Sequence, residues 1–192
     1  FQDRDIDFLM EDSTKAPLKK QVKSKKKADK KSFLNVIKEF QKIEGLFTLY
    51  WNEKTNQAYV SILPKQLDHI YLAGLTRQSG DGYYLDGSSM LNEYPFMFKQ
   101  VGKRIQFVNA NVKFRADENS PFRRSVEKHT SHSILSSTNI ASDPHPETGA
   151  MLADIGKLFF YDIEEITRRS QGVYSFDKKD SYFTSLKSFP LN

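Results

Sequence analysis

The histidines are the first side chains to consider for metal chemistry, because imidazole is the commonest metal ligand in proteins. His129 and His132 are three residues apart, whereas a zincin helix needs histidines at i and i+4 with a glutamate beside the first. Neither histidine has an adjacent acid. His145 lies between two prolines, with Asp143 and Glu147 nearby. A helix face and a polar turn are the simpler interpretations of these patterns, so we predict no metal ligand.

Acidic, glycine-rich and serine-containing segments form a second group of candidates. Residues 80–87 (GDGYYLDG) hold two aspartates, but Tyr84 and Leu85 stand at intermediate positions of a calcium loop and no terminal glutamate follows. No Gly-Lys-Ser/Thr follows the glycines, which excludes a phosphate loop, and no Gly-x-Ser-x-Gly elbow occurs. On a helix, Glu164 and Glu165 would point about 100° apart. We therefore predict no catalytic residue in this chain.

Asn111, Arg115 and Arg124 are polar side chains that we expect to lie together, near the start of a helix that follows Pro121. Arginines at such a position usually bind carbonyl or carboxylate oxygens, because the guanidinium group presents several donors in a fixed plane. The sequence thus predicts a structural polar cluster rather than a catalytic one.

The N-terminus separates the charges of the chain into two blocks. Residues 1–12 carry a net charge of −4 and residues 13–31 carry +8, so the rest carries only +1 of the total +5. Like charges repel, and we expect residues 1–31 to be a charged, flexible N-terminal arm. It is either a solvated linker, as the lack of aromatic residues and arginine in residues 13–31 suggests, or a contact for nucleic acid or an anionic membrane through residues 15–31. The candidate contacts are Lys19, Lys20, Lys23, Lys25, Lys26, Lys27, Lys30 and Lys31.

Composition limits the class of protein. The chain has 192 residues, of which 13% are aromatic, and aromatic rings favour pleated sheets. It has no cysteine, which excludes disulfides and cysteine nucleophiles and leaves the compartment open. No apolar run approaches the roughly 20 residues that span a bilayer, so no transmembrane segment is expected. We predict that residues 32–192 form a single globular α+β domain, rich in β-structure, with a mostly antiparallel sheet and a few short helices.

Apolar periodicity and turn residues predict the elements of the N-terminal half. Ser32 would cap an amphipathic helix that ends near Gly45. The further elements are a hairpin with strands at residues 46–51 and 58–63, a helical turn at residues 64–68, and a strand at residues 69–76 that is buried on both faces in its middle.

The C-terminal half contains the most distinct signal, a hairpin around Gly102 with strands at residues 94–100 and 104–109. Pro121 suits the first turn of a helix formed by FRRSVEKHTSHSIL. The other predicted elements are a short strand at residues 112–115, a pairing of residues 138–141 with residues 149–154, one helix or two short ones within residues 155–170, and a closing helix at residues 181–189.

Five segments of the chain, taken in their order and spacing, resemble one known family. They are IEGLFTLYWNEKTNQAYVSILPKQLDHIYLAG, FKQVGKRIQFVNANVKFRA, PFRRSVEKHTSHSIL, MLADIGKLFFYD and YSFDKKDSYFTSLKSFPLN. From about Lys30 to Asn192 the chain is similar to the domain of unknown function near the N-terminus of large bacterial zinc-dependent metalloproteases of the metzincin-like type. Each segment alone is a weak match, and it is their combination, in this order and spacing, that is specific to the family.

The resemblance implies a non-catalytic role. In that family the HExxH motif lies in a separate domain further along the chain and matches nothing here, so zinc is expected only in that other domain and no cofactor in this chain. The implied partner is the peptidase domain of the same parent protein or another protein subunit. Family members continue beyond this point, which implies a fragment or a protein that ends with the first domain. They carry export signals, which implies an extracytoplasmic place, periplasmic or secreted; a cytoplasmic place stays open.

Two hypotheses about function follow. The first is a non-catalytic accessory domain of a zinc-metallopeptidase-like protein, which packs on a peptidase domain or a partner protein. The alternative is a stand-alone binding protein that uses the lysine-rich arm to dock on an anionic partner: nucleic acid, an anionic membrane or an acidic protein. Binding by charge weakens steeply as salt rises, because neutralised charges release counterions, and this separates the two hypotheses.

Overall fold

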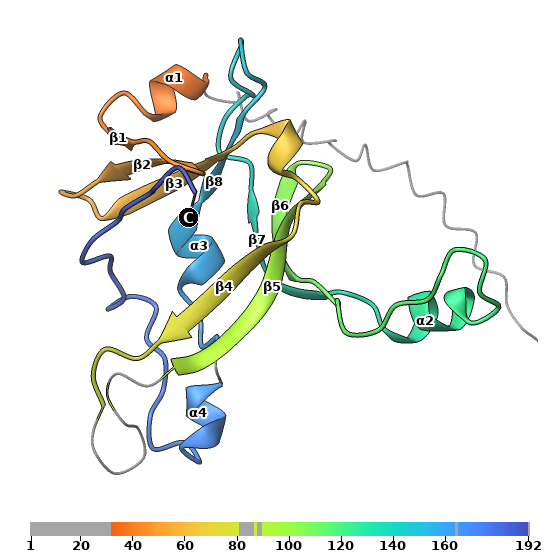
Figure 1. The fold of residues 1–192 in the computed structure, drawn as a ribbon. Coiled ribbons are helices and arrows are strands. Elements are labelled where there is room, and N and C mark those ends of the chain that lie inside the picture. Colours follow the sequence, from red (N-terminus) through yellow and green to blue (C-terminus); the bar gives the residue numbers. More distant parts are fainter. Residues whose placement is uncertain (1–31, 81–86, 88–89, 164, 192) are drawn as a thin grey trace, which may run out of the picture.

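The computed structural model describes residues 32–80, 87, 90–163 and 165–191 (Figure 1). The predictions for residues 1–31, including the lysine contacts, lie outside the described residues, as do the aspartates of residues 80–87 and Glu164. Within the described part of the chain, two antiparallel four-stranded sheets are accompanied by a few short helices. The predicted fold class, α+β with mostly antiparallel β-structure, is confirmed.

The first sheet has the strand order β1-β2-β3-β8. Its strands are β1 (Gln41–Ile43), β2 (Thr48–Asn52), β3 (Gln57–Ile62) and β8 (Met151–Asp154). The predicted β2–β3 hairpin is confirmed, and Asn52 fixes its turn by accepting from the N–H of Thr55 at 3.2 Å. Asn56 follows in a left-handed conformation (φ 52°), which asparagine tolerates better than most residues.

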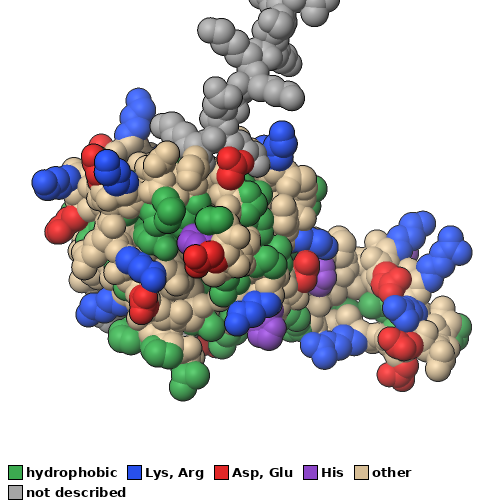
Figure 2. All heavy atoms as spheres, turned by 90° about the horizontal axis from the view of Figure 1, so that it is seen from above, with side chains coloured by type: hydrophobic (Ala, Val, Ile, Leu, Met, Phe, Trp, Pro, Cys, Tyr) green, Lys and Arg blue, Asp and Glu red, His purple; other side chains and the backbone are tan. Residues whose placement is uncertain are grey.

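The second sheet has the strand order β4-β5-β6-β7. Its strands are β4 (Tyr71–Thr76), β5 (Met90–Val101), β6 (Arg104–Asn109) and β7 (Ser133–Asn139). β5 and β6 form the predicted hairpin, and Gly102 (φ 58°) supplies the left-handed residue that its tight turn requires. The first half of β5 pairs with β4 and the second half with β6. Between β6 and β7 the chain projects from the body as a lobe, seen at the right of Figure 2.

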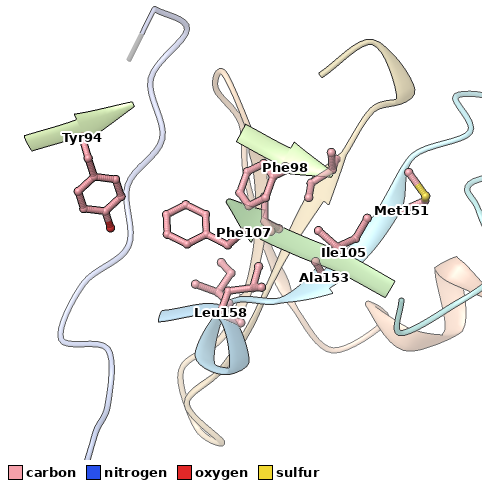
Figure 3. Close-up of a cluster of buried hydrophobic side chains, with 11 residues drawn as sticks. Tyr94, Phe98, Ile105, Phe107, Met151, Ala153 and Leu158 are labelled. Carbon is pink, nitrogen blue, oxygen red and sulfur yellow. The ribbon is translucent and has the colours of Figure 1, made fainter. Parts of the chain in front are cut away.

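The main core lies between the two sheets and α3 (Ile155–Phe159), and it draws side chains from both sheets (Figure 3). Phe107 of β6 is fully buried there. Its ring centroid lies 5.1 Å from that of Phe96, 5.9 Å from that of Phe98 and 4.9 Å from that of Phe159. Because aromatic rings bury large apolar areas, this cluster joins the second sheet to α3, and buried residues of the first sheet such as Val60 and Ile62 complete the core.

The opposite face of the first sheet is covered by α1 (Phe33–Val36) and the residues that follow it. The predicted helix ending near Gly45 is wrong beyond its first turn, because the backbone of residues 41–43 pairs with β2 as β1. Ser32 makes no capping hydrogen bond through its side chain. The apolar residues with helical spacing still point to one surface: Phe40, for example, packs on Tyr59 with ring centroids 5.3 Å apart.

The remaining short helices agree in place with the sequence prediction and differ in length. The helical turn is η1 (Pro64–Gln66), and residues 155–170 hold two short helices, α3 and α4 (Ile166–Arg169). The helix after Pro121 is α2 (Arg123–His129), which is shorter than predicted because residues from Ser133 onward join the second sheet as β7. No described helix is long and apolar enough to cross a membrane.

The closing helix predicted at residues 181–189 is wrong. The end of the chain instead docks on the body at the start of β2. The N–H of Leu46 donates to the carbonyl of Phe189 at 2.7 Å, and Oγ of Ser188 donates to the carbonyl of Phe47 at 2.6 Å. These contacts with a distant segment hold residues 188 and 189 in a non-helical path along the body.

The strand predicted at residues 112–115 is also wrong. The N–H groups of Lys113 and Phe114 donate to Oδ1 of Asn111 at 3.2 and 3.4 Å. A side chain that takes backbone donors in this way competes with a β-ladder. The segment therefore leaves the sheet and forms a turn.

Two strand predictions are correct in position and wrong in environment. Residues 138–141 and 149–154 do meet, through a bridge between Ile140 and Ala153, but β7 pairs mainly with β6 and β8 pairs with β3. β4 is not buried on both faces. Its burial alternates, with Tyr71, Ala73 and Leu75 half-buried and Leu72, Gly74 and Thr76 exposed.

Candidate interaction surface

The chain leaves the second sheet after Asn109 of β6 and returns to it at Ser133 of β7, which is opposite Asn109. The residues between them, 110–132, form a lobe that contains α2, and we call it the α2 projection (Figure 1). None of the α2 residues is buried. Because a helix of seven residues is marginal on its own, local hydrogen bonds must hold this segment in place.

Asn111 fixes the base of the projection. Its backbone N–H donates to Nδ1 of His132 at 2.9 Å, and its Nδ2 donates to the carbonyl of Thr130 at 2.7 Å. These two bonds join the outgoing chain to the returning chain, while Oδ1 organises the turn that follows. Asn111 therefore acts through its backbone N–H, Nδ2 and Oδ1, and loss of its side chain would loosen the whole base.

α2 itself depends on short-range contacts. Oγ of Ser120 accepts from the N–H of Phe122 at 3.2 Å, just before the helix begins. Arg123 and Glu127, one turn apart, form an ion pair of 2.8 Å between Nε and Oε1, and both side chains are exposed. Such surface pairs contribute about 0.3–0.5 kcal/mol each, so this pair adds only a little to the stability of the helix.

Two cavities open on this part of the molecule. The first, the base cavity, has a volume of about 470 Å³ and lies between the projection and the first half of β5. Its lining includes Asn92, Glu93, Asn109, Asn111, Lys113 and His129. The second, the outer cavity, has a volume of about 530 Å³ and lies within the projection, lined by residues such as Arg115, Asp117, Phe122 and Val126. Both present polar and apolar groups side by side.

The surface of the projection combines exposed rings with charge. Phe114 is 61% exposed and Phe122 is 71% exposed, although both are large apolar side chains. Residues 110–132 also carry five Lys or Arg side chains against three carboxylates, a net charge of +2. Figure 2 shows these charged groups gathered on the lobe. Exposed aromatic residues beside arginines are typical of protein–protein contact surfaces.

The residues of the predicted polar cluster all belong to the projection, but they occupy different places on it. Asn111 lines the base cavity, and Arg115 lines the outer cavity. Arg124 is exposed on α2. Among the described residues, neither arginine forms a hydrogen bond or an ion pair, so both guanidinium groups can reach a partner. No local pattern in the sequence indicates that His132 would accept a hydrogen bond from the backbone N–H of Asn111.

The histidines have structural contacts. Nδ1 of His145 accepts from the N–H groups of Glu147 and Thr148 at 3.2 and 3.4 Å, as in a polar turn, and its ring packs edge-on against Phe33 with centroids 4.9 Å apart. Nδ1 of His132 is occupied by the Asn111 bond. The described residues include no group of three or more His, Cys, Asp or Glu that could hold a metal ion.

The structure is a β-rich fold from which a partly basic lobe with exposed aromatic side chains projects. Residues 88–192 match the family described as Domain of unknown function (DUF5117), and the chain belongs to that family. The matched residues include β5, β6 and the entire α2 projection. No curated protein and no solved structure matches the chain. The family description assigns no activity, so the function has to be argued from the surface.

Proposed function

We propose that this chain is a non-catalytic accessory domain of a zinc-metallopeptidase-like protein, and that it packs on the peptidase domain of its parent protein or on another subunit. The observation that carries the proposal is the α2 projection, whose helix has no buried residue and which exposes Phe114 and Phe122. Ordering such a segment costs conformational entropy and buries little apolar surface. A partner that covers the two rings would offset that cost.

The type of partner is inferred from the resemblance of five segments to the domain that precedes the catalytic domain in large bacterial zinc-dependent metalloproteases. In those proteins zinc belongs to the other domain. The described residues do not fit a zinc site, because no cluster of metal-ligating side chains occurs among them. No catalytic step is assigned to this chain. The same resemblance supports an extracytoplasmic place, periplasmic or secreted.

Contact through the projection would combine two kinds of interaction. Phe122 would insert into an apolar pocket of the partner, because a buried aromatic anchor supplies most of the affinity in many interfaces. Arg115 and Arg124 would bind carboxylates or carbonyl groups around it, since a guanidinium group can donate two parallel hydrogen bonds. Arg123, next to Arg124 in the sequence, is already paired with Glu127 at 2.8 Å.

The direct test is to purify the native protein from its own source and measure its intact mass, zinc content and hydrolysis of casein. We expect a polypeptide heavier than the 22.2 kDa of these 192 residues, or a stable complex, with about one zinc and with activity that a chelator abolishes. The isolated 192 residues should have no such activity. Chelator-sensitive hydrolysis by the isolated chain would overturn the proposal, as would a native protein of 22.2 kDa without a zinc-containing partner.

The surface is tested with variants of the same native protein. Replacing Phe122 and Arg124 together (Phe122→Ser with Arg124→Glu) should weaken association of the accessory and peptidase parts by tenfold or more, roughly, because an aromatic anchor and a charge contact are lost. Val101→Ser is a matched control, because Val101 is exposed at the β5–β6 turn on another part of the molecule. If both variants associate with the peptidase part equally well, the α2 projection is not the contact surface.

A second candidate function has one specific observation in its favour, the net charge of +8 on residues 13–31. In this alternative the N-terminal arm docks on nucleic acid, an anionic membrane or an acidic protein. The affinity for a defined DNA duplex or for anionic vesicles should then fall steeply with salt and disappear when residues 1–31 are deleted. If the deletion leaves both affinities unchanged, the arm is a linker.

A further inference from the structure

The outer edge of β4 differs from the other edges of the two sheets. β1 is only three residues long, its Lys42 pairs with Glu44 at 2.7 Å, and the chain end at Phe189 bonds beside it. The outer edge of β8 is occupied by a bridge between Ala153 and Ile140. β7 lies against α3, where Oγ of Ser136 donates to the carbonyl of Leu158. Charges, short length and cover are the usual ways to protect an edge. Within the described residues β4 has six residues, no charge, no proline and no such cover.

The pattern of hydrogen bonds in β5 shows which of its residues face β4. The carbonyl of Phe98 accepts from the N–H of Asp68, on the side of β4, at 2.9 Å. The carbonyl of Pro95 accepts from the N–H of Ala110, on the side of β6, at 2.8 Å. Backbone groups of an antiparallel strand alternate between its two neighbours. The even-numbered residues therefore face β4, and Tyr94 is one of them.

The register then fixes the free groups of β4. Ala73 is opposite Tyr94, so the N–H and C=O of Ala73 bond to β5. The N–H and C=O groups of Leu72 and Gly74 must then point to the outer edge. No described residue pairs with them, and these groups have the spacing that an added strand needs.

The exposed face of β4 next to this edge has an apolar side chain, that of Leu72, beside an open space at Gly74. Leu72 is 70% exposed, and Ile70, just before the strand, is also exposed. A Cβ built at Gly74 would meet no heavy atom of the described residues within 4 Å, so with respect to that part of the chain the space above Gly74 is open. In sheets, an aromatic ring from the neighbouring strand commonly covers a glycine of this kind, because the ring restores the contacts that glycine lacks.

We propose that the outer edge of β4 binds an extended segment of a partner protein as an added strand, with an aromatic side chain of that segment over Gly74 and an apolar side chain beside Leu72. A second copy of this chain fits less well, because the only ring of β4 is on the opposite face. That ring, Tyr71, packs on Phe47 and Phe96 with centroids 4.9 and 5.5 Å away. This inference goes beyond the proposed function, since it concerns a different surface and holds for a partner that is not a peptidase.

The test uses the full chain and the neutral nonapeptide TEVTFTVKT, acetylated, amidated and labelled with a fluorophore. Its central phenylalanine has valines two residues away on the same face of a strand. We expect a dissociation constant below roughly 1 mM by fluorescence anisotropy. We also expect slower hydrogen exchange at the amides of Leu72 and Gly74 when the peptide is bound. The peptide TEVTATVKT should bind roughly tenfold more weakly, because the ring over Gly74 is lost.

Backbone pairing is tested by methylating single peptide nitrogens. N-methylation of the central phenylalanine removes the donor that faces Gly74 and should weaken binding by roughly tenfold, whereas N-methylation of the preceding threonine, whose N–H faces away, should have little effect. On the protein, Leu72→Lys should reduce binding, and Ile134→Lys is the matched control, because Ile134 is an exposed apolar residue of β7.

Several results would overturn the proposal. These are no binding of either peptide, equal binding of the alanine and phenylalanine peptides, equal effects of the two methylations, and protection of amides away from β4. A concentration-dependent dimer of the free chain that Leu72→Lys abolishes would also overturn it, in favour of a second copy as the occupant. None of these outcomes bears on the mass and zinc content of the native protein, so the two proposals can fail separately.

Discussion

The body and the α2 projection use the same types of residue in opposite ways. In the body, Phe107 and Leu158 are completely buried between the two sheets and α3. In the projection, Phe114 and Phe122 are mostly exposed, and only its base is anchored, by a small apolar cluster that includes Ala110 and Val112 and by the hydrogen bonds of Asn111. From this difference in burial we expect the sheets to supply most of the stability of the fold and the projection to add little. A segment that contributes so little to the fold is more readily explained by what it contacts.

The largest effect should come from the centre of the body. Phe107→Ala removes a ring that lies within 6.3 Å, centroid to centroid, of four other rings, and it leaves a cavity in a close-packed core. Such substitutions cost about 3–5 kcal/mol, a large part of the stability of a domain of this size. Denaturant unfolding followed by circular dichroism measures the loss. Phe107→Leu retains most of the apolar volume and should lose clearly less.

The next effect concerns the base of the projection. Asn111→Ala removes the Nδ2 bond to the Thr130 carbonyl and the Oδ1 acceptor of the following turn. We expect a local loss of about 1–2 kcal/mol, seen as roughly tenfold faster amide exchange in residues 113–130. The exchange of β6 should not change. Asn119→Ala, at an exposed asparagine of the same projection, is the control, and faster exchange in both variants would mean that the projection has no fixed base.

Asp162 lies in the body, just before α4, and like Asn111 in the projection it holds a local segment by hydrogen bonds. Its two carboxylate oxygens accept from the N–H groups of Ile166 and Thr167 at 2.7 and 2.9 Å, at the start of α4. Burial alone would raise the pKa of Asp162, but the bonds from Thr167 and Ile166 and the charge of Arg169 together lower it.

The sign of the pH dependence follows from that shift. A carboxyl group whose pKa is lower in the folded state stabilises the fold at neutral pH, and this contribution is lost as the pH falls through the folded pKa. Asp162→Ala should therefore cost about 1 kcal/mol at neutral pH and nothing in acid. Unfolding free energies of both proteins at neutral and acidic pH measure this, and a constant difference would show that the ionised carboxylate is not the stabilising form.

Local signals explain why the hairpins could be predicted from the sequence. Gly102 and the polar residues around Asn52 set tight turns, and the alternating apolar residues on either side need no information from elsewhere. The same local reasoning failed for residues 33–45. Their apolar residues have helical spacing, but β2 is available as a partner and the chain pairs with it after one turn.

The candidate surface could be predicted only in part, because some of its contacts join segments that are far apart in the sequence. Asn111 was expected to have a structural role, and its position next to a turn is a local signal. Its contact with His132 depends on the return of the chain 21 residues later, which the sequence does not specify. The docking of Ser188 on the carbonyl of Phe47, 141 residues away, escaped prediction for the same reason.

The smallest effect on stability should come from Phe122, and it tests the comparison most directly. Phe122→Ala removes the same type of side chain as Phe107→Ala. The ring of Phe122 is 71% exposed, however, so its removal should change the unfolding free energy by less than about 0.5 kcal/mol. Association with the partner should nevertheless weaken if the ring is a contact residue. A loss of stability close to that of Phe107→Ala would mean that the ring packs on the body in solution, and the projection would then be part of the fold.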